Sequence, residues 1–86
     1  MVKETIVIKN ETGLHARPAT EIAKEAMKYP CEIYLEVKGK KVNAKSPLMI
    51  MSAGITSKTE LEIICDGEKE QEAIGEIKQI FENIEE

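Results

Sequence analysis

With 86 residues, the chain has the size of one small domain, and we expect residues 1–86 to form a single domain. Hydrophobic residues make up 42% of it and aromatic residues 3%, so we expect a core of aliphatic side chains. The net charge of −4 is interpreted as spread along the chain without a basic block, which argues against direct binding to nucleic acid.

The N-terminal half of the sequence predicts a strand, a helix and a second strand. Residues 2–9 are rich in β-branched and apolar side chains, which is typical of a strand. Over residues 16–28 the apolar positions recur at helical spacing, and this pattern ends before Pro30. Residues 32–37 alternate between polar and apolar side chains, as in a strand with one buried face.

The middle of the chain predicts a hairpin and a short helix. A tight turn over residues 38–40, with glycine at its centre, leads into a short antiparallel strand over residues 41–43. Ser46 and Pro47 then open a helix over residues 48–52, which is too short for more than one or two turns. Gly54 is well placed to end this helix in a left-handed conformation.

The C-terminal part predicts a strand and a long amphipathic helix. Residues 60–65 have the alternation of a strand, and Asp66-Gly67 turns the chain. Residues 68–84 then form a helix whose apolar side chains lie along one stripe: Ala73, Ile74, Ile77, Ile80, Phe81 and Ile84. Gly75 weakens this helix by about 1 kcal/mol relative to alanine, which burial of the stripe offsets.

The predicted order is therefore β-α-β-β-α-β-α. Strands with one apolar face need a layer of helices on that face, which predicts a two-layer, open-faced α+β sandwich with a four-stranded antiparallel sheet. We expect the other face of the sheet to be solvated, with these side chains pointing outward: Glu32, Tyr34, Glu36, Glu60 and Glu62.

The two cysteines, Cys31 and Cys65, fit no metal or redox spacing, and we interpret each as a small buried hydrophobe within a strand. A single histidine without a nearby cysteine makes a metal site implausible, and we expect no metal and no cofactor. Lys3 and Glu4 interrupt any apolar run at the start, so we expect no signal peptide, no membrane insertion and a cytoplasmic location.

The segment Gly13-Leu14-His15-Ala16-Arg17-Pro18-Ala19 holds the only histidine, at the expected start of a helix. Backbone N–H groups and the positive end of the helix dipole favour an anion there, and the dipole also keeps the imidazole neutral and nucleophilic. The guanidinium of Arg17 suits phosphate oxygens. Alternatively, His15 only caps the helix and Arg17 is a surface cation, although histidine is a poor cap. Residue types alone leave both interpretations open.

The same segment resembles the active-site signature of HPr, the histidine-containing phosphocarrier family of the bacterial sugar phosphotransferase system. Lys45-Ser46 and Met51-Ser52-Ala53-Gly54 resemble a second signature of this family, and the similarity extends over the whole chain. The resemblance implies that His15 accepts a phosphoryl group on Nδ1 from enzyme I, passes it to IIA domains of sugar permeases, and is assisted by Arg17. It also implies a carrier that is not itself an enzyme, and we expect a monomer.

Ser46 stands before the short helix, where the sequence alone favours an ordinary N-cap serine. The resemblance adds a second role, because HPr proteins of Gram-positive type are phosphorylated at this serine by HPr kinase/phosphorylase. The phosphorylated form acts as corepressor with a catabolite-control transcription regulator. Pro47 departs from the family pattern, which has a branched apolar residue there, and it removes one amide that would hold a phosphate. Met49 also departs, since glycine or a polar residue is more common.

Transfer between phosphohistidines needs a weak, short-lived interface, so we expect an exposed apolar patch close to His15. The predicted docking residues are Ala16, Arg17, Thr20, Lys24 and Met27 on the first helix, and Pro47, Leu48 and Met51 on the short one. Leu48 and Met51 suit the core equally well, but we expect Ile50 inside and Leu48 at least partly exposed. Arg17 and Lys24 would attract an acidic partner.

The residues and the resemblance together leave three functions open. The first is the phosphocarrier, with a carrier for a nitrogen-regulatory branch as its variant. The second is an HPr-like regulatory paralogue that acts through Ser46. Such paralogues typically lack the histidine, so His15 argues against this as the sole role. The third is an interaction module without phosphoryl chemistry, which leaves the pair of His15 and Arg17 unexplained.

Overall fold

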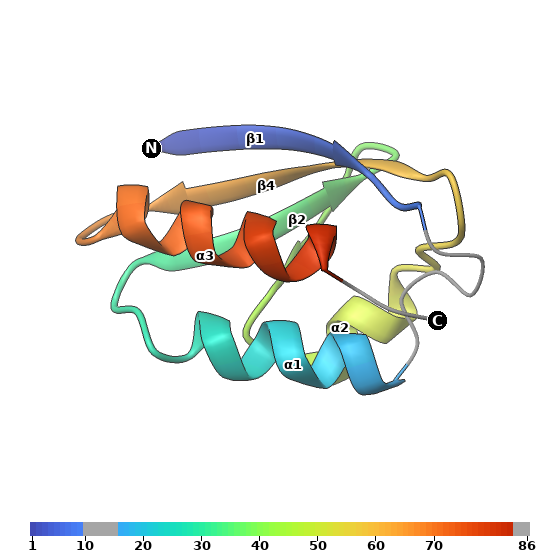
Figure 1. Ribbon diagram of the computed structural model, residues 1–86, viewed down its shortest axis with the longest axis horizontal. Coiled ribbons are helices and arrows are strands. Elements are labelled where there is room, and N and C mark those ends of the chain that lie inside the picture. Colours follow the sequence, from blue (N-terminus) through green and yellow to red (C-terminus); the bar gives the residue numbers. More distant parts are fainter. Residues whose placement is uncertain (10–15, 84–86) are drawn as a thin grey trace.

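The computed structural model describes residues 1–9 and 16–83 and has the element order that the sequence predicts (Figure 1). The elements are β1 (Val2–Val7), α1 (Ala16–Ala26), β2 (Glu32–Val37), β3 (Lys40–Asn43), α2 (Pro47–Ser52), β4 (Glu60–Asp66) and α3 (Glu70–Glu82). None of the helices in the described part is long and apolar enough to cross a membrane.

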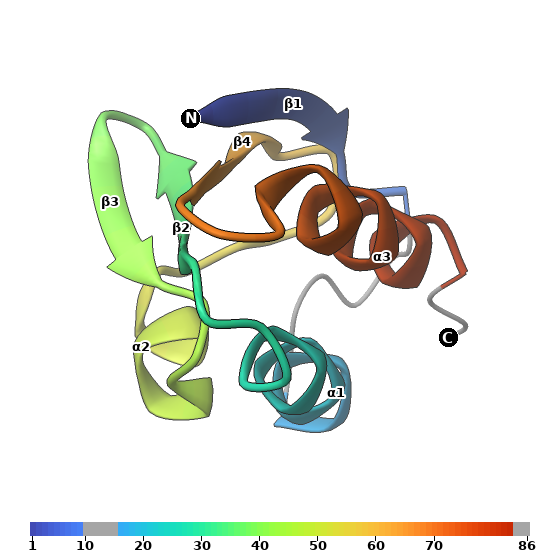
Figure 2. The same cartoon turned by 90° about the vertical axis from the view of Figure 1, so that its left-hand side faces the viewer.

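The four strands form one antiparallel sheet in the order β1-β4-β2-β3. At its centre, Leu35 of β2 lies opposite Val42 of β3 on one side and Ile63 of β4 on the other. The three helices cover one face of this sheet, with α1 between α2 and α3 (Figure 2). The predicted α+β sandwich is therefore confirmed.

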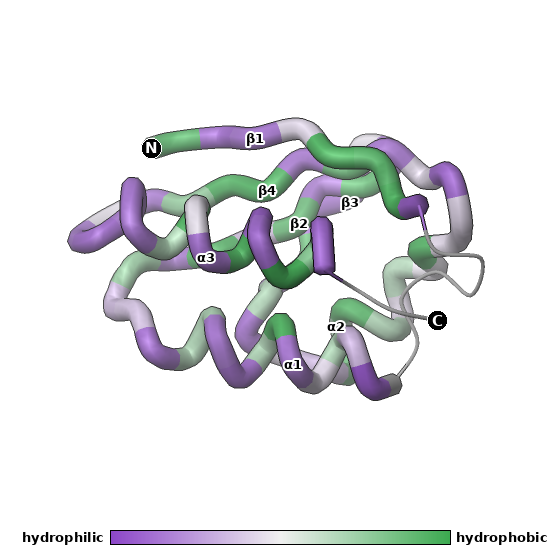
Figure 3. The backbone as a smooth tube through the Cα atoms, in the orientation of Figure 1, coloured by the Kyte–Doolittle hydropathy of each residue, from purple (hydrophilic) through white to green (hydrophobic). Residues whose placement is uncertain are grey.

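Aliphatic side chains fill the space between the sheet and the helices. The most deeply buried large residues come from every layer: Ile22, Ile33, Leu35, Ile50, Leu61, Ile63 and Ile77. Along α3, hydrophobic and hydrophilic residues alternate with the helical repeat (Figure 3). Of the predicted stripe, Ala73, Ile74, Ile77 and Phe81 are buried and Ile80 packs against the core, while Ile84 lies outside the described residues.

Both long helices are shorter than the sequence predicts. Helix α1 ends at Ala26, because the next turns tighten: the N–H of Lys28 donates to the carbonyl of Glu25, three residues back, at 3.1 Å. The predicted start of α3 at residue 68 is wrong. Lys69 has a left-handed backbone with φ 65°, and the N–H of Gly67 donates to the Glu70 carboxylate at 3.0 Å, so residues 67–69 form a turn.

The predicted turns are confirmed where positive φ angles occur. Lys38 and Gly39 have φ angles of 52° and 80°, the geometry of a two-residue hairpin whose twist matches the sheet. Because this turn needs only two residues, β3 begins at Lys40, one residue earlier than predicted. Gly54, with φ 68°, follows Ala53, the C-cap of α2, and has the predicted left-handed conformation.

The outer face of the sheet is mainly polar, and its aliphatic residues are Val7 and Ile64. Ile64 is only 4% exposed although it points away from the helices, since it lies between Lys3 and Tyr34 of the neighbouring strands. Cys31 precedes β2 instead of belonging to it, but both cysteines are buried as interpreted. Burial, with the neighbouring Cys31 thiol, raises the pKa of Cys65 to about 12.

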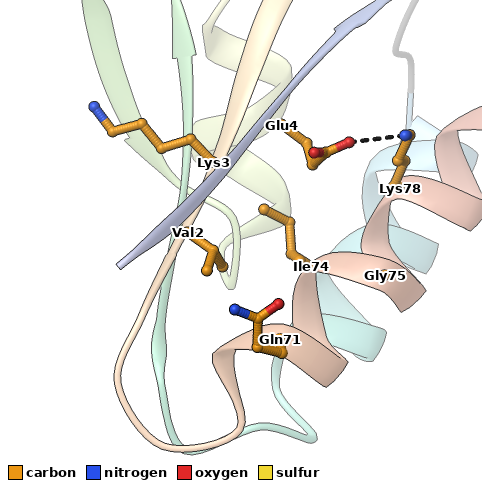
Figure 4. A pocket seen from close by; sticks show the side chains of 7 residues that line it. All are labelled: Val2, Lys3, Glu4, Gln71, Ile74, Gly75 and Lys78. Carbon is orange, nitrogen blue, oxygen red and sulfur yellow. Dashed lines mark hydrogen bonds and ion pairs between the residues drawn. The ribbon is translucent and has the colours of Figure 1, made fainter.

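A groove runs between β1 and α3 (Figure 4). It is lined by Val2, Lys3, Glu4, Gln71, Ile74, Gly75 and Lys78. The Nζ atom of Lys78 donates to the Glu4 carboxylate across it at 2.7 Å. None of the residues that the sequence singled out for function lines this groove.

Candidate functional site

The histidine segment lies in the sequence between β1 and α1, and hydrogen bonds fix the chain just after β1. After β1, the N–H of Ile8 donates to the carbonyl of Thr59 at 2.9 Å, and the N–H of Lys58 donates to the carbonyl of Ile8 at 2.7 Å. Helix α1 then begins at Ala16. His15 lies outside the described residues, but it directly precedes this helix in the chain.

The start of α1 has the character that an anion requires. Arg17 is exposed, whereas Pro18 and Ala19 face the core. Residues 16–19 include no acidic side chain that would oppose an anion. Pro18 lies in the first turn, where its missing N–H costs no hydrogen bond. A guanidinium and the positive end of the helix dipole therefore act together at this position.

Ser46 is the N-cap of α2, as the sequence predicts. Its backbone is extended (φ −114°, ψ 112°), and its Oγ accepts a hydrogen bond from the N–H of Met49 at 3.3 Å. Its carbonyl accepts the N–H of Ile50 at 3.1 Å, which starts the helical pattern. Pro47 occupies the first helical position, where it suits the required φ angle.

The end of α1 and one side of α2 expose large apolar side chains. The exposed fraction is 73% for Leu48, 58% for Met27 and 38% for Met51, whereas Ile50 is fully buried. The alternative in which Leu48 and Met51 belong to the core is therefore wrong, because a helix of six residues presents only one of its side chains to the interior. Monomeric proteins rarely expose such groups together unless they bind something.

The other predicted docking residues lie around these apolar side chains. Lys24 is exposed on α1, and Thr20 and Pro47 are partly buried. Met49, which the sequence prediction did not include, is also 43% exposed. Its position in the sequence could have predicted this exposure, because it lies between Leu48 and the single buried residue of a very short helix.

Charges are segregated along the chain, and the interpretation that they are spread evenly is wrong. Five lysines and no acidic residue stand in residues 38–59, which include β3 and α2. Ten acidic residues and two lysines stand in residues 60–86, which include β4 and α3. The elements beside the exposed apolar side chains are thus the basic ones, which a whole-chain net charge conceals.

Lys45, to which the sequence analysis gave no role beyond the second signature, links the segment after α1 to the start of α2. The Nζ atom of Lys45 donates to the carbonyl of Tyr29, just after α1, at 2.9 Å. The backbone N–H of Lys45 donates to the Asn43 side chain at 2.9 Å. No local sequence pattern predicts this contact, because its partners are 16 residues apart.

Comparison with known proteins gives the family. Residues 2–83 match the model described as the PTS HPr component phosphorylation site. The chain belongs to the HPr family. HPr-family phosphocarriers are not enzymes in themselves, and the described elements are those of their fold.

Individual HPr-family relatives cover nearly the whole chain. The HPr-like protein Crh of Bacillus subtilis is 42% identical over 77 residues, which are 90% of this chain and 91% of Crh. The histidine-containing phosphocarrier protein of a mycoplasma matches with a TM-score of 0.90 and 39% identity, covering 92% of this chain and 90% of its own. Crystalline Crh of B. subtilis matches with a TM-score of 0.77 and 39% identity over 95% and 94% of the chains, and it is an intertwined, swapped dimer. The expected monomer is thus not a general property of these relatives.

Proposed function

We propose that this chain carries a phosphoryl group of the sugar phosphotransferase system on His15. The Nδ1 atom of His15 attacks the phosphorus of phosphorylated enzyme I, so that one N–P bond forms as the donor's N–P bond breaks. The reverse event, with a IIA domain of a sugar permease as acceptor, passes the group on. The observation that carries the proposal is the exposed Arg17 at the acid-free start of α1, directly after His15, in an HPr-family chain.

Arg17 stabilises the transferred group in this proposal. Its guanidinium donates to the oxygens of the phosphoryl group, and the amides of the first turn add their dipoles. Both interactions hold the three phosphoryl oxygens while the group passes between the two nitrogens, which positions the phosphorus for in-line attack and stabilises the charge on these oxygens.

The exposed side chains Met27, Leu48 and Met51 supply the docking surface in this proposal. Ala16, Thr20, Lys24 and Pro47 complete it. An acidic partner is favoured because α2 and β3 lie in the basic part of the sequence. The contact is small and transient, as expected of a carrier that must leave each partner after transfer.

The test of the carrier proposal is phosphate incorporation. The full chain is incubated with phosphoenolpyruvate, Mg²⁺ and enzyme I, and the product is examined for an acid-labile, base-stable phosphate. We expect incorporation into the native chain and none into His15→Ala. Arg17→Lys keeps the charge but loses the planar fork, so we expect slower transfer. A native chain that remains unphosphorylated excludes the proposal.

We further propose that Ser46 is a regulatory phosphorylation site, modified by an ATP-dependent HPr kinase/phosphorylase. A phosphate at this N-cap adds negative charge where the dipole of α2 favours it, so the fold survives the change. The same charge repels an acidic partner and slows transfer to His15. We expect Ser46→Asp to slow phosphorylation by enzyme I, with Ser46→Asn, which keeps a good N-cap side chain without the charge, as the matched control. Equal rates for Ser46→Asp and the native chain exclude this brake.

A second candidate is a regulatory paralogue that binds a catabolite-control transcription regulator. It is favoured by the 42% identity to Crh of B. subtilis. The two candidates differ in which residue matters: binding to the regulator that depends on Ser46 but not on His15 supports the regulatory role. A carrier for a nitrogen-regulatory branch would instead transfer to different acceptor domains. We also propose a cytoplasmic, single-domain monomer, which sedimentation at increasing concentration tests.

A further inference from the structure

Lys45 bridges two elements that the docking surface combines. Its Nζ atom donates to the carbonyl of Tyr29 at 2.9 Å, and its side chain is partly buried there. Tyr29 lies three residues after the end of α1, and its own N–H donates to the carbonyl of Ala26, the last residue of that helix. The ammonium therefore lies near the negative end of the α1 dipole, where a cation is favoured.

The other end of this bridge is the start of α2. The backbone N–H of Lys45 is held by the Asn43 side chain at 2.9 Å. The next residue, Ser46, is the N-cap, and its carbonyl accepts the first hydrogen bond of the helix from Ile50. A shift of the Lys45 backbone therefore moves the first turn of α2 with it.

Helix α2 is anchored in the core by a single side chain. It contacts α1, but of its six residues only Ile50 is buried, so the bond from Lys45 is an additional tie between the two helices. The exposed side chain of Met27 follows α1, whereas those of Leu48 and Met51 belong to α2. Their relative position depends on the distance between the end of one helix and the start of the other.

We propose that Lys45 is a positioning residue, whose bond to the Tyr29 carbonyl holds α2 against α1 in the arrangement that partner proteins recognise. This deepens the proposed function, on which it rests for its kinetic consequence. Lys45 acts through the two helices, and its ammonium is already bonded within the molecule. It therefore differs from exposed lysines such as Lys40, which act on a partner only through long-range charge.

Three variants of the full chain test this proposal as substrates of enzyme I. Lys45→Met keeps most of the side-chain volume and removes the donor. We expect it to raise KM about tenfold, the effect of losing one charge-assisted hydrogen bond, with kcat unchanged. Lys45→Arg can still donate to the carbonyl and should restore KM. Lys40→Met removes the same charge from the hairpin and should leave KM close to that of the native chain.

A second measurement does not depend on phosphoryl transfer. Hydrogen exchange of the Ile50 amide, which bonds the Ser46 carbonyl, reports how firmly α2 is held. We expect Lys45→Met to speed this exchange and to move the methyl resonances of Met27 and Met51, while the amides of the central strand β2 stay protected and show that the chain is folded. Lys40→Met should change neither.

The outcomes separate the two proposals. If the native chain takes no phosphate from enzyme I, the carrier proposal fails, and exchange at Ile50 still decides the role of Lys45. If Lys45→Met and Lys40→Met raise KM equally, only charge matters and the positioning role is excluded. An unchanged KM for Lys45→Met, or unchanged exchange at Ile50, excludes it as well.

Discussion

Helices α2 and α3 meet the same sheet in opposite ways. The thirteen residues of α3 bury four apolar side chains, and its exposed side chains are glutamates and glutamines. The six residues of α2 bury one and expose Leu48, Met49 and Met51. The exposed part of an apolar side chain does not stabilise the fold, since it remains in water in both states. The comparison therefore assigns stability to the α3 side, and in the proposed function recognition belongs to the α2 side.

Charge follows the same division. The part of the chain that contains α2 is basic and the part that contains α3 is strongly acidic, although the whole chain has a net charge of −4. An acidic partner is attracted by one side and repelled by the other, which orients the encounter before contact. The following predictions test this division, beginning with the largest effect.

Among these changes, shortening a buried side chain of α3 should lower the free energy of unfolding the most. Ile77 is fully buried against the sheet. We expect Ile77→Ala to reduce the free energy of unfolding by about 2–5 kcal/mol, from lost burial and the cavity left behind. Chemical denaturation measures this value. Where the variant is folded, its KM for enzyme I should equal that of the native chain. A raised KM would contradict the assignment of stability to α3 and recognition to α2.

On α2 we expect a substitution to weaken partner binding while the free energy of unfolding stays nearly unchanged. Leu48 is 73% exposed, so Leu48→Glu should change the free energy of unfolding by less than about 0.5 kcal/mol. In the proposed docking surface, the same change places a carboxylate against an acidic partner and should weaken binding by at least about 1–2 kcal/mol. Titration calorimetry with enzyme I measures it. Glu76→Gln, on the exposed side of α3, is the control and should bind like the native chain.

The ion pair across the β1–α3 groove should contribute to stability only weakly. Lys78 and Glu4 are 2.7 Å apart but both are solvated, and the pair raises the pKa of Lys78. We expect Glu4→Gln to lower the thermal midpoint slightly at low salt and not at 1 M NaCl, where charges are screened. A large decrease that persists in salt would mean that this pair, and not the apolar stripe, fixes α3.

The smallest effect concerns the N-terminal amine. It lies 3.0 Å from the Glu70 carboxylate, at the first turn of α3. Hydrogen bonds from the Gly67 amide and from this amine lower the pKa of Glu70, so the carboxylate stabilises the fold above pH 4.5. That contribution is lost as pH falls through the lowered pKa. We expect Glu70→Gln to flatten the acid side of a stability profile; an identical profile would contradict this.

Local features of the fold were predictable because local chemistry decides them. The β-branched strands, the turn at Lys38-Gly39 and the left-handed Gly54 follow from backbone preferences. The strand order β1-β4-β2-β3 and the burial of Ile64 do not, since each depends on which distant segments pair. The start of α3 was predicted two residues early, because a left-handed Lys69 has no signature in the sequence.

The candidate site was only partly predictable. The N-cap role of Ser46 and the exposure of Leu48 follow from residue type and helix length. The bond from Lys45 to Tyr29 needs the packed helices before it exists. The segregation of charge was visible in the sequence, but it emerges only when the charges are counted element by element.

The most direct test of the central claim is a chase of the labelled protein. The native chain is loaded with ³²P from phosphoenolpyruvate through enzyme I, freed of enzyme I, and mixed with a IIA domain. The account predicts that the label leaves this chain and appears on the IIA domain, and that His15→Ala never takes it up. Label that stays on the native chain, or that His15→Ala accepts equally well, would contradict the account.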